Sequence, residues 1–214
     1  MPTPKSGRRR QSSASRPSVF LNLPYDQRFE SLFLAYIAGV RALGMSPRAT
    51  LEIPGSTRRL DRIFQLISSC PYSIHDLSRV QLDRSKPTTP RFNMPFELGL
   101  AVAHEKSGAE HRWFVFEAMR HRIMKSLSDL NGTDVYIHGG TINGVFAQLG
   151  NAFLRGGPQP TIAQMRAIYV ELRSSISGVL HDSGARTVFE ARPFQELSAI
   201  ARGLATRIVL GESQ

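Results

Sequence analysis

The polar residues best placed to do chemistry gather in one stretch of the chain, between residues 72 and 103. The apolar run at 72–77 predicts a buried strand, residues 79–92 a polar loop, and Pro95 the start of a helix. This order places four polar side chains around one strand-to-helix turn: Asp76, Ser78, Asn93 and Glu97. Ligands of open α/β sheets bind beyond the carboxyl ends of the strands, at such turns. A carboxylate among polar neighbours there makes a candidate site for sugar or nucleotide chemistry.

These residue types also have ordinary structural uses. An acid in the first turn of a helix, where Glu97 is predicted, is favourable by about 0.3–1 kcal/mol because of the helix dipole. Asn93 suits an N-cap position, and an acid that ends a strand, such as Asp76, often only holds a loop. The local sequence therefore leaves a structural and a chemical role open for each of them.

An earlier segment carries a matching set of polar residues. Asn22 is a polar residue in the apolar strand predicted at 18–23, so it needs a hydrogen-bond partner or faces a ligand. Asp26 follows that strand and could cap the next helix or line a site. His75 stands on a predicted strand, where we expect a core histidine with its hydrogen bonds satisfied. The chain has no glycine-rich phosphate loop, zinc-ligand spacing or Gly-x-Ser-x-Gly elbow, so we predict neither a metal site nor a bound cofactor.

Strand and helix patterns alternate along most of the chain. Apolar runs of strand length recur at 18–23, 48–53, 72–77, 112–116 and 135–137. Apolar residues at helical spacing follow these runs, at 29–43, 60–67, 95–105, 123–130 and 142–153. Such alternation predicts an α/β fold, with a parallel sheet and helices on both of its faces.

The pattern changes after residue 155. Glycines and prolines at 156–160 mark a boundary, and Thr161 with Gln164 forms the signature of a capping box. Two apolar stripes, at 162–180 and 194–208, predict a hairpin of amphipathic helices that packs on the main domain or on a partner chain. We therefore predict a tail at 1–17, an α/β domain at 18–157 and a helical appendage at 158–214.

Composition narrows the class of protein. Hydrophobic residues make up 41% of the 214, enough for a core. No apolar run approaches the roughly 18 residues of a membrane span, and the N-terminus lacks the apolar region of a secretory signal, so we expect no membrane partner. The single cysteine, Cys70, lies on the apolar face of a predicted helix. We expect it to be a core residue, which favours a reducing, cytoplasmic location.

The net charge of +10 suggests an anionic partner. Half of that excess lies in residues 1–17, which contain five basic residues and no acid. This tail is rich in Ser, Pro and Arg, so we predict that it is a disordered, solvated leader. Contact with nucleic acid is predicted only through this tail, and the charge on the remainder could draw in a ligand that carries phosphate.

Three segments, taken in order, carry a resemblance to a known family. Val19 to Asn22, followed by Pro24, Tyr25 and Asp26, resembles the first strand and loop of a TIR domain. Residues 74–78 resemble the TIR strand before the catalytic loop, and the Phe-Glu-Leu-Gly of 96–99 resembles the helix start that carries the TIR glutamate. Nucleoside 2-deoxyribosyltransferases are similar in the same region, as is a bacterial TIR-like group found near defence genes. Residues 94–96 replace the tryptophan–cysteine pair usual before that glutamate.

This resemblance covers residues 18–155 and implies both a fold and a site. The fold would be a flavodoxin-like, TIR-like α/β domain with five parallel strands, followed by the C-terminal helical hairpin. Glu97 would be the catalytic carboxylate. The nucleotide substrate would be bound by Asn22, Tyr25, Asp26, Asp76, Ser78 and Asn93. The shared chemistry of these families is cleavage of an N-glycosidic bond, in which a carboxylate stabilises oxocarbenium character on the ribose or attacks C1′.

NAD is the favoured substrate on chemical grounds. Its nicotinamide is already cationic and leaves as a neutral molecule without a proton, so one carboxylate suffices. A neutral purine would also need a general acid, which Asp26 or Asp76 would have to supply. We therefore expect an NAD-consuming enzyme of prokaryotic anti-phage defence or signalling, with NAD as substrate rather than cofactor.

Such an enzyme would work as a homo-oligomer or with a partner protein of a defence system, as the resemblance implies. Two other functions stay open on the sequence. One is a nucleoside or nucleotide N-glycosidase or deoxyribosyltransferase. The other is a non-catalytic TIR-like module that binds a nucleotide signal or a protein.

Overall fold

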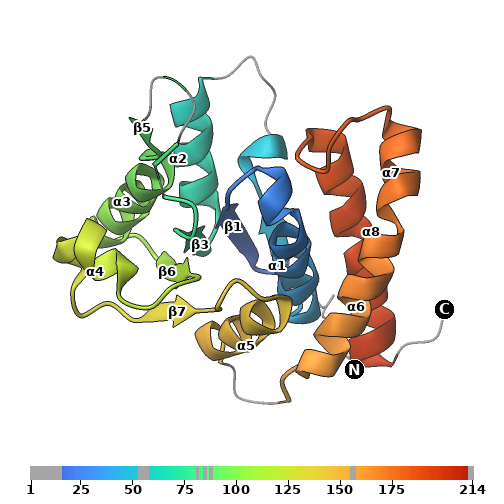
Figure 1. The fold of residues 1–214 in the computed structure, drawn as a ribbon. Helices are drawn as coiled ribbons and strands as arrows, with labels where there is room; N and C mark the ends of the chain where they lie inside the picture. Colours follow the sequence, from blue (N-terminus) through green and yellow to red (C-terminus); the bar gives the residue numbers. More distant parts are fainter. Residues whose placement is uncertain are drawn as a thin grey trace, which may run out of the picture.

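A sheet of five parallel strands lies at the centre of the computed structural model, in the order β2-β1-β3-β6-β7 (Figure 1). The structure describes residues 16–52, 58–80, 82–83, 86, 89–154 and 158–211. The strands of the sheet are β1 (Ser18–Asn22), β2 (Ser46–Arg48), β3 (Tyr72–Asp76), β6 (Arg112–Glu117) and β7 (Val135–Ile137). This is the strand order of a flavodoxin-like sheet, so the predicted fold class is confirmed.

Helices cover both faces of the sheet because successive strand side chains point to opposite sides. Val19 and Leu21 share a core with α1 (Glu30–Ala42) and α5 (Ile142–Ala152). Phe20 points the other way, against α2 (Arg59–Ser69) and α3 (Asn93–Lys106). Cys70 is buried in that second core, as predicted.

Short elements connect these layers. They are the 3₁₀ helices η1 (Gln27–Phe29), η2 (Thr50–Glu52) and η3 (Ser128–Leu130), the helix α4 (Arg122–Ser126), and an antiparallel pair of β4 (Leu82–Asp83) with β5 (Thr89–Pro90). The helix predicted at 123–130 is therefore α4 followed by η3. The loop predicted at 79–92 contains β4 and β5.

The register of β1 and β3 brings the candidate residues to one edge of the sheet. Asn22, the last residue of β1, lies opposite His75. His75 is followed by Asp76, at which β3 ends. From β1 the chain crosses to β2 on one side, and later strands add on the other side, through β3. Such a reversal is where an open α/β sheet leaves a crevice for ligands.

Two local predictions are wrong. The second strand is β2 at 46–48 instead of 48–53, and it includes Pro47, which an edge strand tolerates because it has a neighbour on one side only. Asn93 is the first residue of α3, and Phe92 takes the N-cap position. Asp26, in contrast, caps the helix that follows it, as predicted, since its carboxylate accepts a hydrogen bond from the Arg28 backbone in η1, which leads directly into α1. The cap predicted at Ser56 or Thr57 lies outside the described residues.

The C-terminal helices pack on the main domain. They are α6 (Ile162–Ser174), α7 (Ile176–Ser183) and α8 (Ala191–Leu210), and α6 and α8 both lie against α1 (Figure 1). The predicted capping box is present, with Thr161 Oγ1 accepting from the Gln164 backbone and Gln164 Oε1 from the Thr161 backbone. The stripe predicted over 162–180 breaks at Ser175. Within the described residues, no helix has both the length and the apolar character needed to cross a membrane.

Gly144 gives a test of this packing. A methyl group on Gly144 would lie 1.9 Å from the carbonyl oxygen of His138, so α5 could not keep its place after β7. We expect Gly144→Ala to lower the free energy of unfolding by about 3 kcal/mol, measured by urea denaturation.

The matched control is Gly150→Ala on the same helix, where the added methyl group has no atom within 4 Å. Alanine favours helix over glycine by up to about 1 kcal/mol, so this change should be neutral or stabilising. Equal destabilisation by both substitutions would contradict the packing of α5 described here.

Candidate functional site

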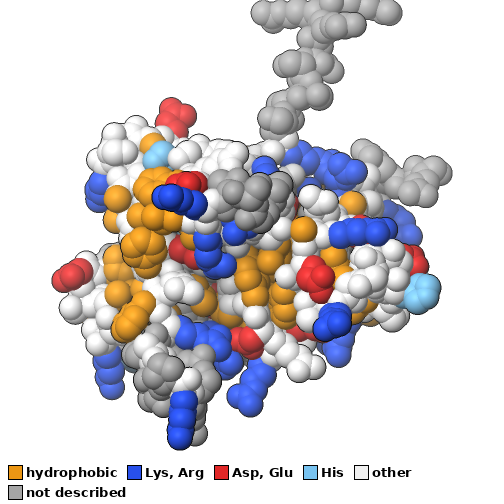
Figure 2. Space-filling model, turned by 90° about the horizontal axis from the view of Figure 1, so that it is seen from above, with side chains coloured by type: hydrophobic (Ala, Val, Ile, Leu, Met, Phe, Trp, Pro, Cys, Tyr) orange, Lys and Arg blue, Asp and Glu red, His pale blue; other side chains and the backbone are white. Residues whose placement is uncertain are grey.

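A cavity of about 320 Å³ opens where β1 ends and α3 begins. Its lining comes from four parts of the chain: Asn22 to Tyr25 at the end of β1 and just after it, Thr50 in η2, Arg59 in α2, and Arg91, Asn93, Met94 and Glu97 just before α3 and in its first turns. Figure 2 looks onto the end of the molecule at which α1 and α2 begin, and shows basic and hydrophobic side chains close together there. The cavity is therefore at the predicted edge of the sheet.

The Asn22 side chain holds this corner together. Its amide nitrogen lies 2.9 Å from His75 Nδ1 and donates to the Met94 carbonyl oxygen at 3.2 Å. One buried amide group therefore joins the end of β1, the end of β3 and the first turn of α3. The hydrogen-bond partner that the sequence required for Asn22 is thus present within the protein.

His75 continues this contact into the core as a chain of hydrogen bonds. Because Nδ1 accepts from Asn22, Nε2 carries the proton and donates to Ser73 Oγ at 2.9 Å. Ser73 in turn donates to His111 Nε2 at 2.8 Å, and His111 Nδ1 donates to the Cys70 carbonyl at 2.8 Å. Burial lowers the pKa of His75 to about 3. His75 is a core histidine with satisfied hydrogen bonds, as predicted.

Glu97 is the buried carboxyl group of the cavity. The residue is 4% exposed, and its nearest charged partner is Arg59, at 3.6 Å between Nη2 and Oε1. Burial raises the pKa of Glu97 from 4.5 to about 7, and Arg59 opposes that rise. A carboxyl group with a pKa near neutrality in a cleft is a candidate for chemistry, because it can act as base, nucleophile or acid.

Arginines line the polar side of the cavity. Arg59 has 57% of its side chain exposed, so it can change partner at little cost. Arg91 reaches Asp26 Oδ2 at 3.8 Å, and Arg79 donates to the same oxygen at 3.1 Å. Asp26 therefore contacts an arginine of the cavity without lining the cavity itself.

Tyr25 forms a wall of the cavity. Its hydroxyl lies 3.2 Å from Thr50 Oγ1, and burial raises its pKa to about 12. Its ring packs edge-on against Phe33 of α1 and contacts Phe189, just before α8. The C-terminal helices thus help to hold one side of the site in place.

An apolar hollow of about 240 Å³ adjoins this cavity. It is lined by Leu60, Ile63 and Phe96 and shares Arg59, Asn93 and Glu97 with the polar cavity. Phe96 is 55% exposed, an unusual state for a large aromatic residue. Glu97 therefore lies at the boundary between a cationic cavity and an apolar surface.

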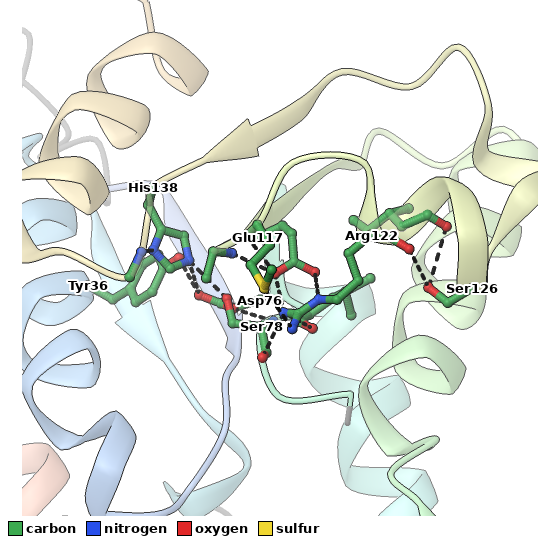
Figure 3. A network of polar contacts seen from close by, with 12 residues as sticks. Tyr36, Asp76, Ser78, Glu117, Arg122, Ser126 and His138 are labelled. Atoms are coloured by element: carbon green, nitrogen blue, oxygen red, sulfur yellow. Dashed lines mark hydrogen bonds and ion pairs between the residues drawn. The ribbon is translucent and has the colours of Figure 1, made fainter. Parts of the chain in front are cut away.

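Asp76 and Ser78 belong to a different, buried network (Figure 3). Asp76 is fully buried, and its carboxylate accepts from the Tyr36 hydroxyl at 2.7 Å and from the Ser78 backbone at 2.9 Å. His138 Nε2 lies 3.2 Å from Asp76 and 3.0 Å from Ser78 Oγ. Burial, then Asp76, raise the pKa of Tyr36 well above its usual value. Neither Asp76 nor Ser78 lines the cavity of Glu97.

Glu117 and Arg122 extend this network across β6. Arg122 Nε donates to Glu117 Oε2 at 2.9 Å, its Nη2 contacts Oε1, and the Ala118 backbone donates to Oε1 at 2.6 Å. Arg122 also donates to the Ser78 carbonyl at 2.7 Å. Buried charges need such complete pairing, so we interpret this network as a structural link that joins the ends of β3, β6 and β7.

The structure therefore divides the predicted site residues into two groups. Asn22, Tyr25, Asn93 and Glu97 line one cavity, with Asp26 at its margin. Asp76 and Ser78 lie outside that cavity. The sequence analysis did not identify Arg59 and Arg91 as site residues. A basic residue at or just before the start of each helix beside the site could have indicated them.

The described residues contain no group of three His, Cys, Asp or Glu side chains that could hold a metal ion. Comparison with models of protein families gives no match, and comparison with curated proteins gives none either. The resemblance to TIR-like domains therefore rests on the three motifs and stays a prediction. The fold alone does not decide function, because flavodoxin-like folds serve many chemistries.

The raised pKa of Glu97 predicts a pH-dependent cost of stability. The pKa of Glu97 is about 7 in the folded protein and 4.5 for the free group. Protonation of Glu97 therefore stabilises the folded state fully below pH 4.5, and this stabilisation is lost as the pH rises through 7. The shift corresponds to about 3 kcal/mol. We expect Glu97→Gln, relative to the native chain, to become more stable by up to that amount between pH 4 and pH 9.

Urea denaturation across this pH range measures the effect. The control Glu110→Gln removes an acid from an exposed position and corrects for loss of one ionisable group. A stability difference for Glu97→Gln that does not grow between pH 4.5 and pH 8 would show that the carboxyl group is not desolvated.

Proposed function

We propose that this chain is a TIR-like, NAD-consuming enzyme that cleaves the N-glycosidic bond of nicotinamide. The observation that carries the proposal is the position of Glu97, a buried carboxyl group between a cationic cavity and an apolar hollow. Cleavage of this bond requires a carboxylate beside the reacting carbon, with phosphate bound on one side and a flat ring on the other.

The two hollows suit the two halves of such a substrate. Arg59 and Arg91 offer planar donors to phosphate oxygens, and the side chains of Asn22 and Asn93 supply neutral polar groups near a sugar. Leu60 and Phe96 offer apolar surface on which a nicotinamide ring could stack. The volumes, about 320 and 240 Å³, are of the size that small-molecule sites have.

The reaction places little demand on acid catalysis. The bond between C1′ and the nicotinamide nitrogen breaks, and its electron pair neutralises the ring nitrogen. Glu97, as carboxylate, stabilises the positive charge that develops on the ribose. Water then adds to C1′ and releases a proton, which gives ADP-ribose; attack by a group of the same molecule would give a cyclic derivative.

Arg59 would change partner when substrate binds. Its side chain is more than half exposed and lies 3.6 Å from Glu97, so its ion pair with Glu97 is loose. A substrate phosphate can instead accept two parallel hydrogen bonds from the Arg59 guanidinium group. Moving Arg59 onto phosphate would leave the Glu97 carboxylate free to face the ribose.

We place this activity in cytoplasmic anti-phage defence or signalling, with self-association or a partner protein, on the resemblance of the three motifs alone. The apolar stripes that made the C-terminal helices a candidate interface are largely buried against α1. The exposed Phe64 of α2 and Phe92, just before α3, are candidates for a partner surface outside these helices.

A second function has support from one observation. A pKa of about 7 leaves Glu97 partly protonated near neutral pH, as a general acid must be. A nucleoside or nucleotide N-glycosidase, or a deoxyribosyltransferase, needs such an acid to protonate a neutral base. Asp76 lies outside the cavity, so Glu97 would have to supply that proton itself.

Glu97→Gln tests the proposed role directly. The amide keeps the size of the side chain and removes its negative charge, so we expect nicotinamide release from NAD to fall by at least about 100-fold. The control Glu105→Gln lies two turns later on α3 and keeps an acceptor for the Trp113 indole, at 2.9 Å in the native chain. Glu105→Gln should leave the rate unchanged.

Nicotinamide release is measured by chromatography, with NAD binding followed in parallel by calorimetry. Retention of NAD cleavage in Glu97→Gln would rule out the mechanism. Tight NAD binding without turnover in the native chain, at concentrations where it self-associates, would favour a non-catalytic nucleotide-binding module.

The pH profile separates the two enzyme proposals. If Glu97 acts as a carboxylate on NAD, kcat/KM should rise as the pH passes through about 7 and then level off. If Glu97 acts as a general acid on a nucleoside, kcat/KM should fall over the same range. Initial rates with NAD and with inosine between pH 5 and pH 9 decide between the two. Turnover of NAD at a rate that rises with pH supports the first proposal, and turnover of inosine at a rate that falls with pH supports the second.

A further inference from the structure

A second hollow, of about 550 Å³, is lined by four arginines: Arg16, Arg41, Arg202 and Arg207. Ser46, Gly203 and Thr206 complete its lining. Arg41 lies in the last turn of α1 and Ser46 opens β2, so the hollow is at the amino edge of the sheet. The ends of α1 and α8 lie together at the lower side of Figure 1, away from the starts of α1 and α2. The arginine hollow is therefore separate from the cavity of Glu97.

Arg41 is held rigidly at the base of the arginine hollow. Its Nε and Nη2 donate to Ser198 Oγ at 3.2 and 2.7 Å, and its Nη1 donates to Ser46 Oγ at 2.9 Å. Ser198 is 4% exposed, so the contact is sheltered from water. These partners are neutral hydroxyls, and no carboxylate of the described residues contacts Arg41.

The charges around Arg41 repel one another. Burial, followed by the charges of Arg202 and Arg16, lowers the pKa of Arg41 to about 10, and Glu52 opposes this change. In the part of the chain that the structure describes, Arg207 is paired with Glu171, and the guanidinium groups of Arg16 and Arg202 contact no carboxylate. Among the described residues, three positive charges around the hollow therefore have no carboxylate in contact.

Helix ends explain only half of these arginines. Arg41 and Arg207 lie in the last turns of α1 and α8, where cations are stabilised by the helix dipole. Arg202 lies two turns before the end of α8, and Arg16 lies outside any helix. An ordinary structural role therefore does not account for the convergence of Arg16 and Arg202 on Arg41.

We propose that the arginine hollow binds an anion that carries two linked phosphate groups. Two phosphates bring about three negative charges near neutral pH, which matches the three unpaired guanidinium groups. Arginine suits this ligand because its planar donors grip two phosphate oxygens at once. The two phosphate groups could belong to a free small molecule or to a phosphorylated lipid headgroup, and both share the chemistry that the hollow recognises.

Calorimetric titration of the full chain with inorganic pyrophosphate tests the site, at constant ionic strength set with sodium chloride. We expect pyrophosphate to bind in the arginine hollow, with affinity lowered at least tenfold by Arg202→Ala and by Arg16→Ala. Both side chains are exposed, so these variants should fold. The matched control is Arg192→Ala, which removes the same charge from the first turn of α8 and should bind as the native chain does.

Three outcomes would overturn the proposal. They are an equal loss of affinity in Arg192→Ala and Arg202→Ala, unchanged affinity in Arg202→Ala, and loss of binding in Arg59→Ala instead, which would place pyrophosphate in the cavity of Glu97. A single-stranded oligonucleotide that binds where pyrophosphate does not would also overturn it.

A parallel sedimentation with phosphatidylcholine vesicles, with and without a bisphosphorylated phosphoinositide, distinguishes the two sources of the phosphate groups. Sedimentation that depends on Arg202 assigns the headgroup, and binding of free pyrophosphate alone assigns the small molecule.

Discussion

The candidate site depends on one buried side-chain amide, that of Asn22. By reaching His75 and the Met94 carbonyl together, this amide fixes the ends of β1 and β3 against the first turn of α3. Glu97 follows Met94 by three residues, almost one helical turn, so its carboxyl group is placed by the same contact. The chain of hydrogen bonds from His75 through Ser73 to His111 makes the arrangement rigid, because each of these side chains has a single proton to donate and a single acceptor for it. A carboxyl group positioned by the scaffold itself needs no ligand to order it.

Among the described residues, three buried carboxyl groups lie at this edge of the sheet, and their partners distinguish them. Asp76 and Glu117 each accept several short hydrogen bonds, which compensate for the water that they lose. Glu97 has a longer contact, with an arginine that is mostly in solvent. An incompletely paired buried charge costs free energy, so such a group persists where function requires it. This contrast makes Glu97, and not Asp76, the candidate for chemistry.

The cavity of Glu97 and the arginine hollow lie at opposite ends of α1. This helix of 13 residues is about 20 Å long, and it begins beside Tyr25 and ends at Arg41. The C-terminal helices cover its outer face and contribute to both ends, through Phe189 behind Tyr25 and through Ser198, Arg202 and Arg207 around Arg41. They are therefore part of the architecture that shapes both hollows.

The sequence by itself determined the fold class, the capping box of α6, the core positions of Cys70 and His75, and the region in which polar residues meet. These features follow from local periodicity and from residue types that have few alternatives. It could not determine the position of β2, because an edge strand with one neighbour is set by pairing with β1 more than by its own apolar pattern. Nor could it separate Asp76 from Glu97, since both are acids at the end of an element. The tertiary structure decided that question: desolvation and partners depend on residues such as Tyr36, His138 and Arg59, which are distant in sequence and adjacent only in the folded chain.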